Sequence, residues 1–130
     1  MISLDPNIIV RLLTRDDPAQ VAAVERLLDQ PDAVFWIDDV AMLETQWVLS
    51  RAYAWPRETI VTAFNQLLSL PDTRFDDREC MEQAVDAFAQ GTDFADALLT
   101  YRSRAHGCDS LASLDDALCR RFPDFARKPK

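Results

Sequence analysis

The sequence is poor in the residues that build zinc sites. It contains one histidine, His106, and its three cysteines form no CxxC pair. A zinc centre therefore lacks its usual ligands. A catalytic pair of Cys108 and His106 has no support in the surrounding sequence. We expect all three cysteines to be small buried apolar side chains in a reducing compartment: Cys80, Cys108 and Cys119.

Long apolar runs and flexible linkers are also missing. No stretch approaches the roughly 20 apolar residues that a helix needs to cross a bilayer. The N-terminus lacks the basic segment followed by an apolar segment that is typical of a signal peptide. We therefore expect a cytoplasmic protein without membrane contact. With only two glycines and no low-complexity segment, residues 1–130 are predicted to form a single domain, in which residues 126–130 are a candidate disordered tail.

Basic residues are in the minority, with 14 Lys and Arg against 22 Asp and Glu, so the formal net charge is −8. This balance argues against broad electrostatic binding of nucleic acid. It does not exclude a nuclease, because carboxylates that gather around divalent cations add negative charge to a chain. Few basic residues are interleaved with the tryptophans, so we expect core or interface positions for Trp36, Trp47 and Trp55.

Acidic residues interrupt or follow apolar segments at four places. A carboxylate among apolar neighbours is costly unless something pairs with it, and too few basic residues lie nearby to pair with all four. A shared divalent cation is the economical explanation, and oxygen ligands without His or Cys suit Mg²⁺ or Mn²⁺. The sequence therefore indicates a metal-dependent enzyme whose candidate ligands are Asp5, Glu44, Asp96 and Asp115.

Each acidic residue also has an ordinary structural explanation. Glu44 could simply face solvent, and Asp96 could pair with Arg102 or Arg104, although neither is at ideal helical spacing. The others are candidate helix N-caps: Asp5, Asp93 and Asp115. Taken singly, these explanations are about as good as a catalytic one.

Short apolar runs alternate with amphipathic segments along the chain, which predicts an α/β fold. The runs are predicted strands at residues 2–4, 33–37, 73–75 and 110–114. They are continuous rather than alternating, which indicates a parallel sheet covered on both faces. The predicted helices span residues 7–14, 18–28, 39–53, 57–70, 77–91, 93–105 and 116–121. Ligands of such sheets bind beyond the carboxyl ends of the strands, where Asp5 and Asp115 are expected.

Four segments in order resemble the motifs of one enzyme family. They are LDPNIIVRLL at residues 4–13, LETQWVL at 43–49, DFADAL at 93–98 and the segment from Gly107-Cys108 to Ser113-Leu114-Asp115. Together, and nearly from end to end, the chain resembles the PIN-domain ribonucleases, and among them the VapC toxins of VapBC toxin–antitoxin pairs.

The resemblance implies a three-layer α/β/α sandwich with a central, mostly parallel sheet. It also implies an Mg²⁺- or Mn²⁺-dependent endoribonuclease with an RNA substrate, a homodimer, and a VapB-type antitoxin that silences it and carries any DNA binding. The family's acidic quartet matches Asp5, Glu44, Asp96 and Asp115. Supporting positions around these ligands are expected for Asn7, Ser113 and Asp93.

The sequence departs from the family pattern at two positions of the site. Pro6 replaces the usual Thr or Ser after the first acidic residue, which removes a hydroxyl and a backbone donor. A PIN-fold protein that binds metal or a partner without cutting RNA is therefore the alternative. The doubled acid Asp115-Asp116 leaves two candidates for the last ligand, of which the motif favours Asp115. An aspartyl-phosphate enzyme is disfavoured because the only lysines are Lys128 and Lys130.

Overall fold

The structure, a computed structural model, describes all residues from Met1 to Lys130 and divides into two compact units, Met1–Arg78 and Glu79–Lys130. Seven helices are interleaved with five short strands, and every strand pair is parallel. The predicted α/β class and the parallel pairing are therefore confirmed. None of the seven helices has the length and apolar character that crossing a bilayer requires.

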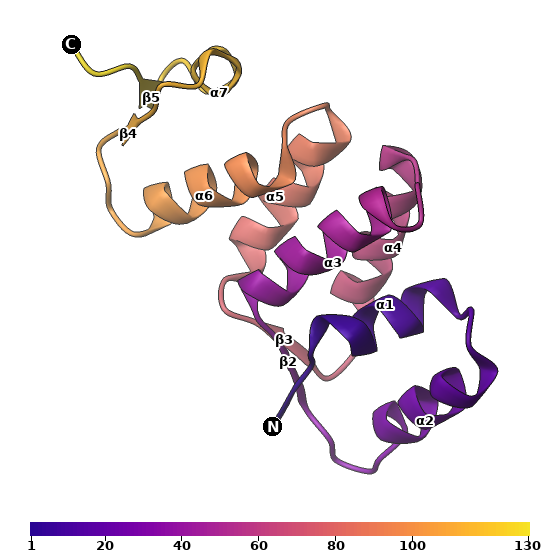
Figure 1. The fold of residues 1–130 in the computed structure, drawn as a ribbon. Coiled ribbons are helices and arrows are strands. Elements are labelled where there is room, and N and C mark those ends of the chain that lie inside the picture. The colour runs from indigo at the N-terminus through magenta and orange to yellow at the C-terminus, as the bar shows by residue number, and fades with distance from the viewer. The chain divides into compact units, whose positions relative to one another are not determined.

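The first unit contains a three-stranded parallel sheet in the order β1-β2-β3. Its strands are β1 (Ile2–Ser3), β2 (Phe35–Ile37) and β3 (Thr73–Phe75), and its helices are α1 (Pro6–Thr14), α2 (Pro18–Leu28), α3 (Asp39–Arg51) and α4 (Arg57–Ser69). Two helices connect each strand to the next, and right-handed crossovers in one direction place both helix pairs on the same face. Accordingly α1 packs against α2 and α3, and α3 packs against α4 (Figure 1).

Burial differs from residue to residue along the strands. Both residues of β1 are exposed, because this strand is short and lies at the edge of the sheet. Along β2 and β3, Trp36 is half-buried and Arg74 is exposed. Their strand neighbours are buried: Phe35, Ile37, Thr73 and Phe75. The side chains thus alternate between a buried face and a more exposed face, although residues 33–37 are all apolar.

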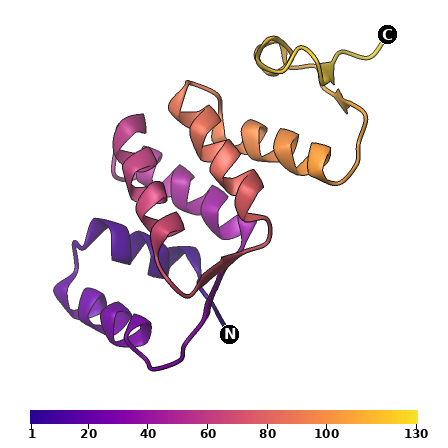
Figure 2. The ribbon, with the colours of Figure 1, turned by 180° about the vertical axis from the view of Figure 1, so that it is seen from behind.

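The second unit begins within α5 (Arg78–Ala89), continues through α6 (Phe94–Ala105) and ends with β4 (Leu111–Ala112), α7 (Asp116–Arg121) and β5 (Ala126–Arg127) (Figure 2). The rings of Phe88 and Phe94 meet edge to face at 5.7 Å between centroids, which joins α5 to the start of α6. Tyr101 of α6 and Phe122 after α7 meet in the same way at 5.6 Å, so the last helix is anchored to α6.

The end of the chain and one cysteine complete the description of this unit. Ala126 and Arg127, at the start of the candidate disordered tail, form β5 and pair with β4. Ala126 is buried in a cluster with Leu118 and Phe122, and this packing orders the end of the chain. Of the cysteines, Cys108 is exposed in the turn after α6 rather than buried.

Candidate active site

Asp5 lies at the junction of β1 and α1. It is the N-cap of α1, and its Oδ2 accepts a hydrogen bond from the Asn7 backbone N–H at 3.4 Å. Pro6 follows at the first helical position, where the missing N–H costs nothing and the fixed φ favours the helix. The capping explanation for Asp5 is therefore confirmed. Its carboxylate nevertheless stays exposed, so capping leaves it accessible to a ligand.

Asp38 occupies the equivalent position after β2. It is the N-cap of α3, and its Oδ1 accepts a hydrogen bond from the Val40 backbone N–H at 2.8 Å. Because β1 and β2 are parallel neighbours, with Ile2 opposite Phe35, their carboxyl ends lie at the same edge of the sheet. The rule that places a ligand site beyond the carboxyl end of a parallel strand applies to Asp38 as well as to Asp5, so Asp38 joins the candidate site.

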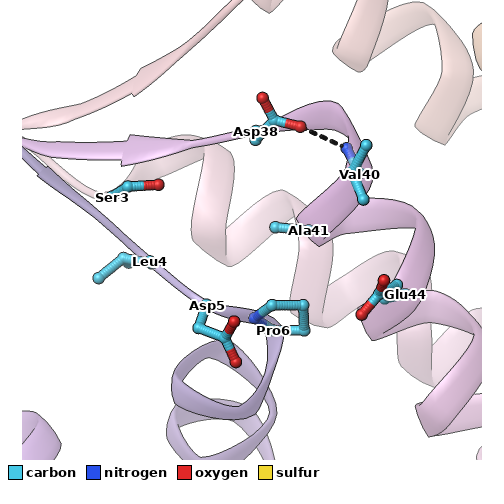
Figure 3. A pocket seen from close by; sticks show the side chains of 8 residues that line it. All are labelled: Ser3, Leu4, Asp5, Pro6, Asp38, Val40, Ala41 and Glu44. Carbon is cyan, nitrogen blue, oxygen red and sulfur yellow. Dashed lines mark hydrogen bonds between the residues drawn. The ribbon is translucent and has the colours of Figure 1, made fainter.

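Asp5, Asp38 and Glu44 line one open hollow of about 380 Å³ in the first unit. Glu44 comes from the second turn of α3 and is exposed. Figure 3 shows the Pro6 ring between the side chains of Asp5 and Glu44. The hollow thus collects three acidic residues, and it holds the proline that replaces the family's usual hydroxyl residue.

The second unit brings Asp93, Asp96 and Asp115 into electrostatic contact. Asp93 is the N-cap of α6, and its Oδ1 accepts a hydrogen bond from the Asp96 backbone N–H at 2.9 Å. The pKa of Asp96 is raised, first by burial and then by the negative charges of Asp93 and Asp115. No cation of the protein contributes to this shift, so the predicted alternative of a pair with a basic residue of α6 is not realised.

Asp115 and Asp116 have different surroundings. Asp115 is the N-cap of α7, and its Oδ1 accepts a hydrogen bond from the Leu118 backbone N–H at 3.1 Å. The Ser113 hydroxyl in turn accepts a hydrogen bond from the Asp115 backbone N–H at 3.0 Å. Asp116 forms an ion pair with Lys128, whose hydrogen bond lowers the pKa of Asp116. The charge of Asp115, and not that of Asp116, therefore affects Asp96.

Arg121 connects α7 to the loop that precedes Asp93. Its Nε donates to the Thr92 hydroxyl and its Nη2 to the Gln90 carbonyl, both at 2.6 Å. Gly91 makes this approach possible, because an added Cβ would lie 2.7 Å from Arg121 Nη2. Its φ of +108° also favours glycine. This clamp fixes the helix that Asp115 caps against the start of the helix that carries Asp96.

Asn7 lies apart from the hollow that Asp5 lines. Asn7 lines a groove of about 430 Å³ between α1 and α2, and it donates its backbone N–H, not its side-chain amide, to Asp5. Trp47, for which a core or interface position is expected, is 60% exposed on α3, so it does not lie in the core. The positions of Asn7 and Trp47 depend on helix packing, which no local motif specifies.

The donors present suit a hard divalent cation, because they are carboxylate oxygens without His or Cys. In neither unit do three or more acidic, His or Cys side chains gather closely enough to form a ready metal site. Each unit instead contributes its own acidic residues: Asp5, Asp38 and Glu44 in the first, and Asp93, Asp96 and Asp115 in the second. The crowding around Asp96 is the kind of repulsion that a bound cation would relieve.

The family model of the PIN domain matches residues 2–122. The chain belongs to the PIN family. PIN domains are typically metal-dependent nucleases. Membership of the family therefore supports a nuclease-like function for the paired acidic residues. A comparison with curated proteins finds no match to this chain.

Proposed function

We propose that this PIN-domain protein is a metal-dependent endoribonuclease toxin of the VapC type. It would cleave RNA phosphodiester bonds and be neutralised by a cognate VapB-type antitoxin. The observation that carries the proposal is that each acid of the predicted quartet has another acidic group beside it. Asp5 and Glu44 line one hollow, and Asp96 and Asp115 repel each other within the second unit.

In this proposal Asp5 and Asp96 are each direct ligands of Mg²⁺ or Mn²⁺. Glu44 completes the ligand set or positions the attacking water, and Asp115 holds a second cation or a ligand water. The bound cation supplies acidification of a water and neutralises charge on the leaving oxygen. The family resemblance implies a 5′-phosphate and a 3′-hydroxyl as products.

The supporting residues restrain these carboxylates through hydrogen bonds. The Ser113 hydroxyl accepts a hydrogen bond from the Asp115 backbone N–H, and the Asp93 carboxylate accepts one from the Asp96 backbone N–H. These bonds restrain the backbone at Asp96 and Asp115. Asn7 contributes its backbone N–H to Asp5. Asp38 adds a third carboxylate to Asp5 and Glu44 on the first unit and would raise the local attraction for a cation.

The proposed partners follow from charge and from an apolar surface. A net charge of −8 suits an antitoxin that brings an arginine to the acidic residues. The groove of about 430 Å³ between α1 and α2, lined by Ile8, Val24 and Leu27 among others, could hold an apolar antitoxin segment. We further propose a homodimer in the cytoplasm, with DNA binding left to the antitoxin.

A silent PIN-fold protein is the second candidate, and Pro6 favours it. Its ring lines the hollow between Asp5 and Glu44, where the family usually carries a hydroxyl. Pro6→Thr restores that hydroxyl, and the N1 position also accepts threonine. Cleavage that appears only in Pro6→Thr would support the silent protein.

The deciding experiment is cleavage of total RNA by the purified protein with Mn²⁺ or Mg²⁺. We expect discrete products that disappear with EDTA and in Asp96→Asn. Asp124→Asn, which removes one charge from an exposed acid outside both groups, is the matched control and should cleave normally. Thermal unfolding provides a second readout, since a cation at 100 times its Kd stabilises the folded protein by about 2.7 kcal/mol. Normal cleavage by Asp96→Asn would refute the assignment of this residue.

A further inference from the structure

One face of α3 extends the candidate site beyond its acidic residues. Val40, Glu44, Trp47 and Arg51 follow one another at intervals of four, three and four residues, so they lie along a single face of the helix. All four are exposed, with Trp47 at 60% and Val40 at 58%. Val40 and Glu44 also line the hollow of Asp5 and Asp38. The exposed face therefore starts in the hollow and continues along the helix.

Arg51 lies over the Trp47 ring, with its guanidinium carbon 5.7 Å from the ring centroid. This is cation–π distance. The contact is notable in a chain with 22 acidic and 14 basic residues, because the guanidinium lies against an aromatic ring rather than a carboxylate. An exposed aromatic ring and a neighbouring cation are the two components of a surface that binds single-stranded nucleic acid.

We propose that Trp47 and Arg51 form a binding platform for single-stranded RNA, which rests on the proposed ribonuclease function. A base stacks on the Trp47 indole, and Arg51 contacts a phosphate beside that base. Trp47 lies three residues beyond Glu44, a rise of about 4.5 Å along the helix axis, and Arg51 about 10 Å beyond Glu44. An RNA strand that leaves the hollow along α3 therefore meets the ring first and the cation second.

The chemistry of this face favours RNA over an apolar protein segment. Glu44 lies between Val40 and Trp47, so a helix packed along the whole face would bury an ionised carboxylate without a partner. A stacked base covers only the ring and leaves Glu44 in contact with water or a cation. Arg51 likewise keeps its charge available for a phosphate oxygen, its preferred partner.

The test is binding of a fluorescently labelled single-stranded oligoribonucleotide, measured by anisotropy in EDTA so that no cleavage occurs. The proteins are all made in the Asp96→Asn background. We expect Trp47→Ala to weaken binding at least roughly five-fold, the lower limit for loss of one stacked base. Trp47→Phe keeps a ring and should recover most of the affinity. Because Trp47 is exposed, circular dichroism should show the same fold in all variants.

The logarithm of RNA affinity should fall less steeply with the logarithm of salt concentration in Arg51→Ala. The slope should become less negative by about 0.7, the value for one lost phosphate contact on a single strand. Arg26→Ala is the matched control, since it removes the same charge from an exposed position on α2. It should leave the slope unchanged. Equal slopes for Arg51→Ala and the parent protein would overturn the role of Arg51.

The outcomes separate this platform from the proposed function. If the wild type cleaves RNA and Trp47→Ala binds and cleaves it equally well, the platform is refuted while the nuclease stands. If the wild type does not cleave but loses RNA affinity on Trp47→Ala, the nuclease fails while the platform stands. If Trp47→Ala instead changes only the sedimentation of the protein alone, this face is an interface between copies, and the proposal is overturned.

Discussion

Replacing Asp115 by alanine and by asparagine should separate its structural role from its proposed chemical role. Asp115 caps the six-residue helix α7 through the hydrogen bond from Leu118 to its Oδ1. Alanine removes the acceptor, whereas asparagine keeps an oxygen that can accept and is as good an N-cap as aspartate. Both variants lose the negative charge that a cation would need.

The size of the stability effect follows from the cap. Loss of an N-cap acceptor costs about 1 kcal/mol, and a chain of this length loses roughly 4 °C in Tm for each kcal/mol. Asparagine gives up a favourable interaction of the charge with the helix dipole, worth about 0.3–1 kcal/mol. It also removes the repulsion between Asp115 and Asp96, which acts in the opposite direction. We therefore expect Asp115→Asn to unfold close to the wild type.

The assay combines thermal unfolding by far-ultraviolet circular dichroism in EDTA with RNA cleavage in Mn²⁺. We expect Asp115→Ala to be less stable than Asp115→Asn, and both to lose cleavage. Asp116→Asn is the control for cleavage, because Asp116 is engaged with Lys128. Equal destabilisation by alanine and asparagine would refute the capping argument. Full cleavage by Asp115→Asn would remove this residue from the site.

Three variants test the electrostatics and the backbone of the second unit. The folded-state pKa of Asp96 is raised above its ordinary value of 3.8, so its stabilising contribution is present below that pH and is lost as the pH rises through the raised pKa. Asp96→Asn should therefore have a higher free energy of unfolding than the wild type at pH 7 in EDTA. Urea titrations should show that this difference disappears below pH 3.8. A difference in stability that persists below pH 3.8 would contradict the argument. Gly91→Ala and Gly107→Ala share a positive φ, of 108° and 95°, and each should cost roughly 1–3 kcal/mol. Chemical denaturation should show a larger loss of stability for Gly91→Ala, because its Cβ would also displace Arg121, whereas a Cβ at Gly107 meets open space. Equal losses of stability would show that the contacts of Arg121 contribute nothing.

The helices were largely predictable because their signals are local. Asp17 before Pro18 and Asp93 before Phe94 mark helix starts by capping chemistry, and the structure places N-caps at both. Thr73–Phe75 and Asp116–Arg121 were predicted with the bounds that the structure has. Each of these elements is specified by a few consecutive residues.

Burial and the surroundings of the site were less predictable because they depend on contacts between distant segments. Nothing in the local sequence indicates that Trp36 lies on the open face of β2, or that Trp47 lies on the exposed face of α3. Asp38 is absent from the predicted site, although the parallel pairing of β1 and β2 places it at the same sheet edge as Asp5. The mutual effect of Asp96 and Asp115 likewise arises from the packing of α7, not from their separation in sequence.

The capping roles of the acidic residues limit how they can meet a cation. At Asp5, Asp38 and Asp115 one carboxylate oxygen already accepts a backbone N–H: Oδ2, Oδ1 and Oδ1, respectively. The second oxygen of each therefore has its lone pairs free, which favours monodentate coordination through Asp5 Oδ1, Asp38 Oδ2 and Asp115 Oδ2. Mg²⁺ accepts such single contacts in its small octahedral shell, whereas Ca²⁺ often takes both oxygens of a carboxylate. The same hydrogen bonds that start the helices would thus make these residues better ligands for the smaller ion.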